Sequence, residues 1–190
     1  MSQAEEFPPN LLDHAPVTYV HIYEDDTFTI GIFILHRGSR IPLHDHPGMH
    51  GILRVLHGVA SIYSYNRDPY QREVPESVRQ TLPSWQRRTA VLPVQDQSAC
   101  EMSPNDPPCV LTPETDNFHE IWAKDGPMAF LDILAPPYHV GGRECHYYRE
   151  LDVTSDKPYL IEAGQPHDFW CDSLTYQGPK IPHDIAKHWS

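Results

Sequence analysis

Basic residues are scarce in this chain of 190 residues, which has 14 Lys and Arg against 26 Asp and Glu and a formal net charge of −12. This deficit of positive charge argues against binding to nucleic acid or to an anionic membrane surface. It is compatible with substrates that carry an amine or another cation. We therefore expect neither nucleic acid nor a membrane as a partner.

The sequence also lacks long apolar runs and paired cysteine motifs. No segment approaches the length needed to span a bilayer, and residues 1–9 have neither the basic start nor the apolar stretch of a signal peptide. None of the four cysteines forms a CxxC pair, so we expect free thiols and a cytoplasmic location. They are Cys100, Cys109, Cys145 and Cys171.

Proline and short β-type segments are abundant. The 20 prolines are spread between short apolar runs, a pattern that disfavours long helices and is typical of many short strands joined by turns. A two-residue period begins at Val17, as in a half-buried strand. The sequence predicts an all-β barrel or sandwich. The expected strands cover residues 17–23, 28–35, 41–46, 51–56, 59–65, 89–94, 118–123, 128–134 and 145–149.

The length predicts one domain over residues 1–190. Within it, residues 1–16 are expected to form an extended lead-in. Residues 66–108 are polar and rich in proline, and we expect them to form an excursion from the barrel in which only 89–94 resembles a strand. Residues 152–190 lack a clear period and are expected to pack on the barrel as a C-terminal extension. No dimerisation signal is evident, so we expect a monomer.

Histidine is the residue type that indicates chemistry. Of the 13 histidines, His44 and His46 are two apart on an expected strand, so their side chains share one face. A third, His119, lies on a distant expected strand. Three imidazoles on one metal ion would leave coordination positions open for substrate and oxygen, but imidazole suits iron, copper, zinc and nickel alike.

The surroundings of the first two histidines narrow the choice of fold. The run from Gly38 to Gly58 has the spacing Gly-X5-His-X-His-X4-Gly-X6-Gly, which resembles the first motif of the cupins. In that motif the position of Gly51 is commonly a glutamate ligand. The resemblance therefore implies a cupin barrel (double-stranded β-helix or jelly roll), flanked by short helical or irregular terminal segments, with three neutral histidines as its metal ligands.

A longer resemblance extends over roughly residues 17–182 and is weakest between 66 and 108. Its segments are 41–51, 111–113, 116–119, 129–138, 142–149, 168–171 and 178–180. Together they resemble the 2-aminoethanethiol (cysteamine) dioxygenase family, with the plant cysteine oxidases as more distant relatives. The resemblance implies a non-haem Fe(II) enzyme that adds both atoms of O2 to a thiol. It implies cysteamine and proteins with an N-terminal cysteine as substrates, a role in oxygen sensing, and His44, His46 and His119 as iron ligands.

The same resemblance suggests roles for further residues. Asp132 is the candidate to orient the substrate amine, with Tyr138 as a hydrogen-bonding neighbour. Cys145 and Tyr147 are candidates for a thioether crosslink near the iron. His50 and His146 are expected to support the ligands from behind or to be structural.

The chemistry explains why this family would use three neutral ligands. They leave the full charge on Fe(II), so a substrate thiol binds as a thiolate and supplies the negative ligand that a glutamate would otherwise provide. The sulfinate product is a largely irreversible oxidation state. Only Arg37 and Arg40 precede His44 as basic residues, which favours an aminothiol or a peptide N-terminus over free cysteine.

Two alternatives remain open at this point. One is a cupin dioxygenase for another substrate class, such as aromatic compounds or diketones. Gly51 and the Cys145 and Tyr147 pair argue against it. The other is a metal-binding regulatory cupin without turnover, against which the intact ligand set argues.

Overall fold

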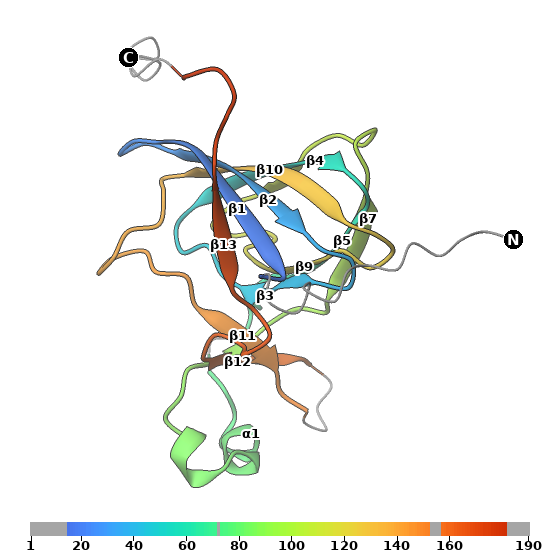
Figure 1. Cartoon of the computed structure of the whole chain (residues 1–190). Helices are drawn as coiled ribbons and strands as arrows, with labels where there is room; N and C mark the ends of the chain where they lie inside the picture. Colours follow the sequence, from blue (N-terminus) through green and yellow to red (C-terminus); the bar gives the residue numbers. More distant parts are fainter. Residues whose placement is uncertain (1–14, 72, 153–156, 182–190) are drawn as a thin grey trace, which may run out of the picture.

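The computed structural model describes residues 15–71, 73–152 and 157–181. They form two facing β-sheets with one short α-helix (Figure 1). The first sheet has the strand order β13 (Cys171–Thr175), β1 (Val17–Glu24), β2 (Thr29–Leu35), β10 (Met128–Ala135), β4 (His50–His57) and β8 (Cys109–Leu111). The second has the order β6 (Val91–Pro93), β12 (Tyr159–Ala163), β11 (Tyr147–Glu150), β3 (Arg40–His44), β9 (Phe118–Trp122), β5 (Ala60–Tyr65) and β7 (Ser98–Met102).

The order of the strands identifies the barrel type. From β2 to β5, and again from β8 to β11, each successive strand lies in the opposite sheet. The chain thus winds back and forth between two sheets, which is the double-stranded β-helix. The expected all-β cupin barrel is confirmed.

The core lies between the two sheets. Because side chains alternate along a strand, every second residue points inward, and the inner residues of both sheets form one apolar cluster that includes Leu35, Ile62, Ile121, Met128 and Phe130. Phe130 stacks on Phe33 with ring centroids 5.3 Å apart. This core holds the two sheets, and therefore β3 and β9, at a defined separation.

The excursion at 66–108 contains more regular structure than the sequence indicates. Helix α1 (Glu76–Thr81) and the 3-10 turn η2 (Ser84–Gln86) precede β6, and α1 lies beyond β11 and β12, at the end of the barrel (Figure 1). A small cluster of its own, which includes Val78 and Leu82, fastens the helix to β12. Strand β7 was not expected because its residues are largely exposed and do not alternate; its register comes from pairing with β5.

Both ends of the described chain join the first sheet. Strand β13 pairs in parallel with β1, and β12 extends the second sheet, so the described part of the C-terminal extension packs on the barrel as strands. Of the lead-in expected over residues 1–16, residues 1–14 lie outside the described part of the chain. No helix of the described part is long and apolar enough to cross a membrane. The division into a single domain with these segments stays a prediction.

A core substitution on β5 tests the packing. Ile62 is 1% exposed and lies in the main cluster, so Ile62→Ala should lower the free energy of unfolding by about 2–5 kcal/mol through lost burial and a residual cavity. Val110→Ala, at a position that is 54% exposed, should change it by less than about 0.5 kcal/mol. Urea unfolding followed by circular dichroism measures both, and equal effects would contradict the described core.

Candidate metal centre

Three buried histidines meet at one point inside the barrel. His44, His46 and His119 are 7%, 3% and 6% exposed, and one ring nitrogen of each lies within 4.8 Å of the others. Their ring centroids are 4.8–4.9 Å apart, and the Nε2 atoms of His46 and His119 are separated by only 3.1 Å. The structure thus brings together the three residues that the spacing and the resemblance indicate.

The sheet places two of these histidines. His44, the last residue of β3, is the register partner of His119 on β9, so the two side chains are direct cross-strand neighbours. A register irregularity between Ile41 and His44 sets this pairing.

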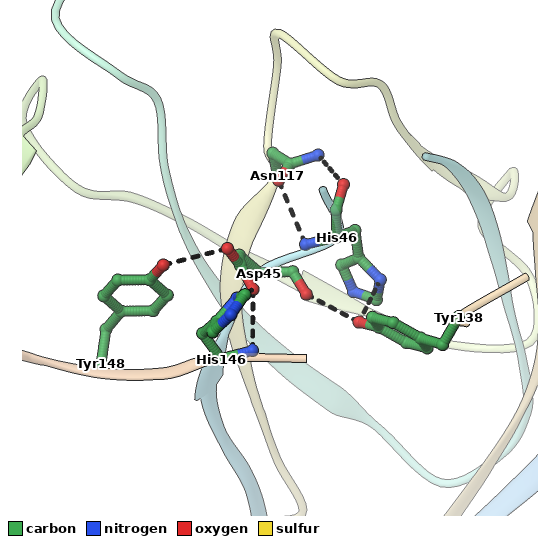
Figure 2. Close-up of polar contacts among 6 residues, drawn as sticks. All are labelled: Asp45, His46, Asn117, Tyr138, His146 and Tyr148. Atoms are coloured by element: carbon green, nitrogen blue, oxygen red, sulfur yellow. Dashed lines mark hydrogen bonds and ion pairs between the residues drawn. The ribbon is translucent and has the colours of Figure 1, made fainter. Parts of the chain in front are cut away.

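The third histidine is held by a side chain that the sequence analysis did not identify. His46 lies beyond the end of β3, and the buried amide of Asn117 replaces the missing strand partner (Figure 2). The His46 N–H donates to Asn117 Oδ1 at 3.1 Å, and Asn117 Nδ2 donates to the His46 carbonyl at 2.8 Å. Asn117 is therefore a positioning residue, whose only sequence signal is a polar residue two positions before His119.

Hydrogen bonds determine which nitrogen of the His44 and His46 rings faces the centre. His44 Nδ1 lies 2.8 Å from the Pro42 carbonyl, which requires a proton on Nδ1. His46 Nδ1 lies 2.7 Å from the Tyr138 hydroxyl, which itself donates to the Asp45 carbonyl at 2.7 Å (Figure 2). Tyr138 therefore accepts the Nδ1 proton of His46. In both rings the lone pair lies on Nε2, where a metal ion would use it.

Electrostatics keeps these rings uncharged. Burial lowers the pKa of all three histidines, and the neighbouring imidazoles lower the pKa of His46 and His119 further, well below the usual value. Neutral rings whose nitrogen lone pairs converge repel one another unless a cation lies between them. The donor set therefore fits a metal ion.

Within the described chain, no carboxylate joins this cluster. The position at which cupins commonly place a glutamate is Gly51, and a Cβ there would lie 2.8 Å from Cγ of Leu111 and 3.1 Å from Cδ2 of Leu134. A glutamate side chain could enter only if these leucines moved. Packing thus supports a ligand set of three histidines alone.

The Asp45 side chain connects the segment after β3 with the segment around His146 and Tyr148. Its carboxylate accepts hydrogen bonds from the His146 N–H at 2.9 Å and from the Tyr148 hydroxyl at 3.0 Å (Figure 2). The His146 ring lies 3.2 Å from the same carboxylate and contacts no ligand histidine in the described contacts. Asp45 was not identified from the sequence. It ties the segment that carries Cys145 and Tyr147 to the segment between His44 and His46.

The metal centre opens into a cavity of about 290 Å³. Its walls are mostly apolar, with Phe33, Leu53 and Phe130 among them, and they also contain the expected Asp132, Tyr138, Cys145 and Tyr147. Cys145 and Tyr147 both face the cavity although β11 begins only at Tyr147. His50 is exposed at the start of β4 and does not line this cavity.

Burial also changes the acidity of the polar groups in the wall. It raises the pKa of the Asp132 carboxyl to about 7, and the pKa values of the Cys145 thiol and the Tyr147 hydroxyl to about 11 and about 12. It raises the pKa of Tyr138 well above its usual value. At neutral pH, Asp132 is thus the group in this wall that takes up or releases a proton.

Comparison with known proteins places this chain in a family. The protein-family model PCO_ADO matches residues 3–181. Human 2-aminoethanethiol dioxygenase is 44% identical over 196 residues, covering 93% of this chain and 72% of the human protein. Plant cysteine oxidase 1 of Arabidopsis thaliana is 36% identical over 142 residues, covering 73% of this chain and 43% of that protein.

The similar solved structures include a cupin superfamily protein from Desulfitobacterium hafniense. The two share 15% sequence identity with a TM-score of 0.43, over 72% of this chain and 95% of that one.

Removing the Tyr138 hydroxyl should weaken metal binding. Tyr138→Phe leaves the His46 Nδ1–H without its acceptor, and loss of such a contact typically costs about 10–100-fold in metal affinity. Anaerobic titration of Fe(II) against a competing chelator measures the change. Tyr70→Phe, at an exposed position, should bind as the native protein does, and an unchanged affinity in Tyr138→Phe would contradict the assigned hydrogen bond.

Asp132 should make the metal-free protein less stable at alkaline pH. Its folded pKa of about 7 exceeds the ordinary value of 3.8, so the native state binds the proton more tightly and stability falls as pH rises from about 4 to about 7. Asp132→Asn should therefore stabilise the metal-free protein by roughly 2–4 kcal/mol at pH 8 and leave stability nearly unchanged at pH 4. Asp26→Asn, at an exposed turn, is the matched control, and equal melting temperatures of Asp132→Asn and native protein at pH 8 would refute the effect.

Proposed function

Because this chain belongs to the PCO_ADO family, we propose that it is a thiol dioxygenase that uses Fe(II) to oxidise cysteamine and the N-terminal cysteine of proteins. The reaction joins both atoms of O2 to sulfur, so that RSH and O2 give RSO2H. Sulfur loses four electrons and O2 gains them, and no further reductant is needed. The sulfinic acid resists ordinary thiol reductants, so the product is a lasting mark.

The observation that carries this proposal is the convergence of three neutral imidazoles on one buried point with no carboxylate beside them among the described residues. His44, His46 and His119 would hold the metal ion. When bound, Fe(II) would supply coordination positions for the thiolate and for O2. The neutral histidines leave its charge uncompensated, which favours the thiolate over the thiol.

Asp132 supplies the complementary charge for the other end of the substrate. Among the described residues it is the only Asp, Glu, Lys or Arg that lines the metal-centre cavity. A substrate ammonium ion near it would pair with the carboxylate and favour its ionised form. Because the thiol and the amine of cysteamine are both recognised, the substrate is oriented with sulfur toward the histidines.

The same walls disfavour free cysteine. Its carboxylate would lie in a cavity with no Lys or Arg among the described lining residues, and an unpaired charge is costly to bury. An N-terminal cysteine carries a neutral peptide bond at that position and avoids the cost. The substrates that fit are therefore a small aminothiol or a peptide N-terminus.

Cys145 and Tyr147 support a further proposal, the thioether crosslink. Both face the metal-centre cavity, and the Cys145 thiol and the Tyr147 hydroxyl influence each other's pKa. Their raised pKa values keep both groups protonated at neutral pH. Joining sulfur to the ring removes two hydrogen atoms, for which O2 is the oxidant.

Oxygen sensing, a cytoplasmic location and a monomeric state belong to the same proposal. O2 is a substrate, so the rate of marking an N-terminal cysteine follows oxygen supply. The four cysteines are free thiols, which suits a reducing compartment.

Product analysis tests the function directly. The protein is loaded anaerobically with one equivalent of Fe(II) and then exposed to air with cysteamine, with free cysteine or with a peptide that begins with cysteine. Mass spectrometry should find the gain of two oxygen atoms on cysteamine and on the peptide, and little on free cysteine. No gain on either preferred substrate would point instead to a regulatory cupin or to another substrate class.

Substitution of a ligand tests the centre. His119→Ala should lower bound iron well below one per chain and abolish thiol oxidation, because two imidazoles hold the ion far more weakly than three. His167→Ala, at an exposed position, is the matched control. It should keep one iron per chain and the native rate of thiol oxidation. Full iron content with undiminished turnover in His119→Ala would remove His119 from the ligand set.

A further inference from the structure

A second cavity, which we call the extension cavity, adjoins the metal centre. It measures about 310 Å³, and five of its lining residues also line the metal-centre cavity. These shared residues are Phe33, Asp132, Leu134, Tyr138 and Cys171. Its other walls are Tyr19, Glu24, Thr29, Gly31 and Ser173, which lead along β1 and β2 toward the exposed Glu24 at the end of β1. A ligand anchored at the metal centre can therefore continue into this space.

A glycine beside Asp132 lets Tyr19 form one wall of the extension cavity. Gly31 is the register partner of Asp132 on the neighbouring strand. A Cβ at Gly31 would overlap Cε2 of Tyr19, so only glycine allows the Tyr19 ring to lie over β2. In this position Tyr19 is close enough to Asp132 and Glu24 for both carboxylates to raise the pKa of its hydroxyl, after the larger effect of burial.

The two cavities together are negatively charged. Among the described residues that line them, Asp132 and Glu24 carry a formal charge, and none is Lys or Arg. Cysteamine carries one positive charge, its ammonium group, which can pair with Asp132. A ligand that uses both carboxylates must carry a second positive charge farther along.

Strand register gives the separation of the two carboxylates. Glu24 pairs with Thr29, and Thr29 pairs with Leu134, which lies two residues beyond Asp132 on β10. With strands about 4.8 Å apart and about 3.4 Å per residue, the Cα atoms of Asp132 and Glu24 are roughly 12 Å apart. An extended peptide advances about 3.3–3.6 Å per residue, so a long side chain on the second or third residue spans that distance.

We infer that the extension cavity receives the two residues after the N-terminal cysteine of a peptide substrate, and that Glu24 selects Lys or Arg there. The inference rests on the proposed function, because it requires the cysteine thiol and amine to be held at the metal centre. It assigns to Glu24 a role in specificity, through a charge that meets the substrate beyond the reacting sulfur.

Matched peptides test the selection. Peptides that begin Cys-Lys-Gly and Cys-Gly-Lys are compared with Cys-Glu-Gly and Cys-Gly-Glu by sulfinate formation at low salt. At one or both positions, kcat/KM should favour Lys over Glu by about three- to tenfold, as expected for a partly exposed ion pair and its repulsive counterpart. The preference should shrink at roughly 1 M salt, where the Debye length is about 3 Å.

Substitution of Glu24 assigns the preference to one carboxylate. Glu24→Gln should bring the ratio of the Lys peptide to the Glu peptide close to one, and Glu24→Lys should invert it. Asp26→Asn, which removes a neighbouring exposed carboxylate outside the cavity lining, should leave the ratio unchanged. A native ratio near one, or a ratio that does not respond to Glu24, would overturn the inference.

A steric variant tests the path of the peptide without relying on charge. Ser173→Trp places a large ring in the extension cavity, so kcat/KM for the Cys-Lys-Gly peptide relative to that for cysteamine should fall by at least about tenfold. An unchanged ratio would mean that the peptide leaves the metal centre by another route. Failure of both cysteamine and every peptide to react would instead refute the proposed function, so the two failures are distinguishable.

Discussion

Three uncharged imidazoles held close together in the buried interior are the constraint on which the rest of the site depends. One ring nitrogen of each lies within 4.8 Å of the others, so the surrounding structure must hold the rings in place until a cation binds. Cross-strand pairing fixes His44 against His119, and the Asn117 amide fixes His46. Tyr138 and the Pro42 carbonyl hold the two Nδ1 protons. These hydrogen bonds, set around an apolar core, hold the three histidine rings in place.

The metal-centre cavity has two ends of different charge. The histidines are neutral because burial lowers their pKa, whereas Asp132 lies in the same cavity wall with its pKa raised to about 7. A substrate with a thiol at one end and an ammonium ion at the other satisfies both requirements at once. The cost of keeping a carboxyl in such a place is lower stability at higher pH, so the residue that we propose for substrate binding should also affect unfolding.

The barrel allows the two proposed classes of substrate to use one centre. Cysteamine would need only the metal-centre cavity, whereas a peptide would also have to leave it. Phe33, Asp132 and Leu134 line both that cavity and the space beside Tyr19, whose ring packs over Gly31. Glu24 is exposed at the end of β1, and we infer that its charge acts on the residues after the cysteine rather than on the reaction.

The sequence by itself determined the all-β class and indicated the candidate ligands His44 and His46, because a two-residue period and the cupin spacing are local patterns that residue order preserves. It indicated His119 through the family that the chain resembles. It also indicated Asp132, Cys145 and Tyr147, through the family they resemble. Only the tertiary structure showed what Asn117 and Asp45 contact and that Glu24 lines a cavity beside Asp132. Their importance comes from contacts between segments distant in the chain, such as Asn117 with His46, Asp45 with Tyr148, and Glu24 with the cavity that begins at Asp132. Such contacts depend on strand register and on how the two sheets close, which no local pattern of residues records.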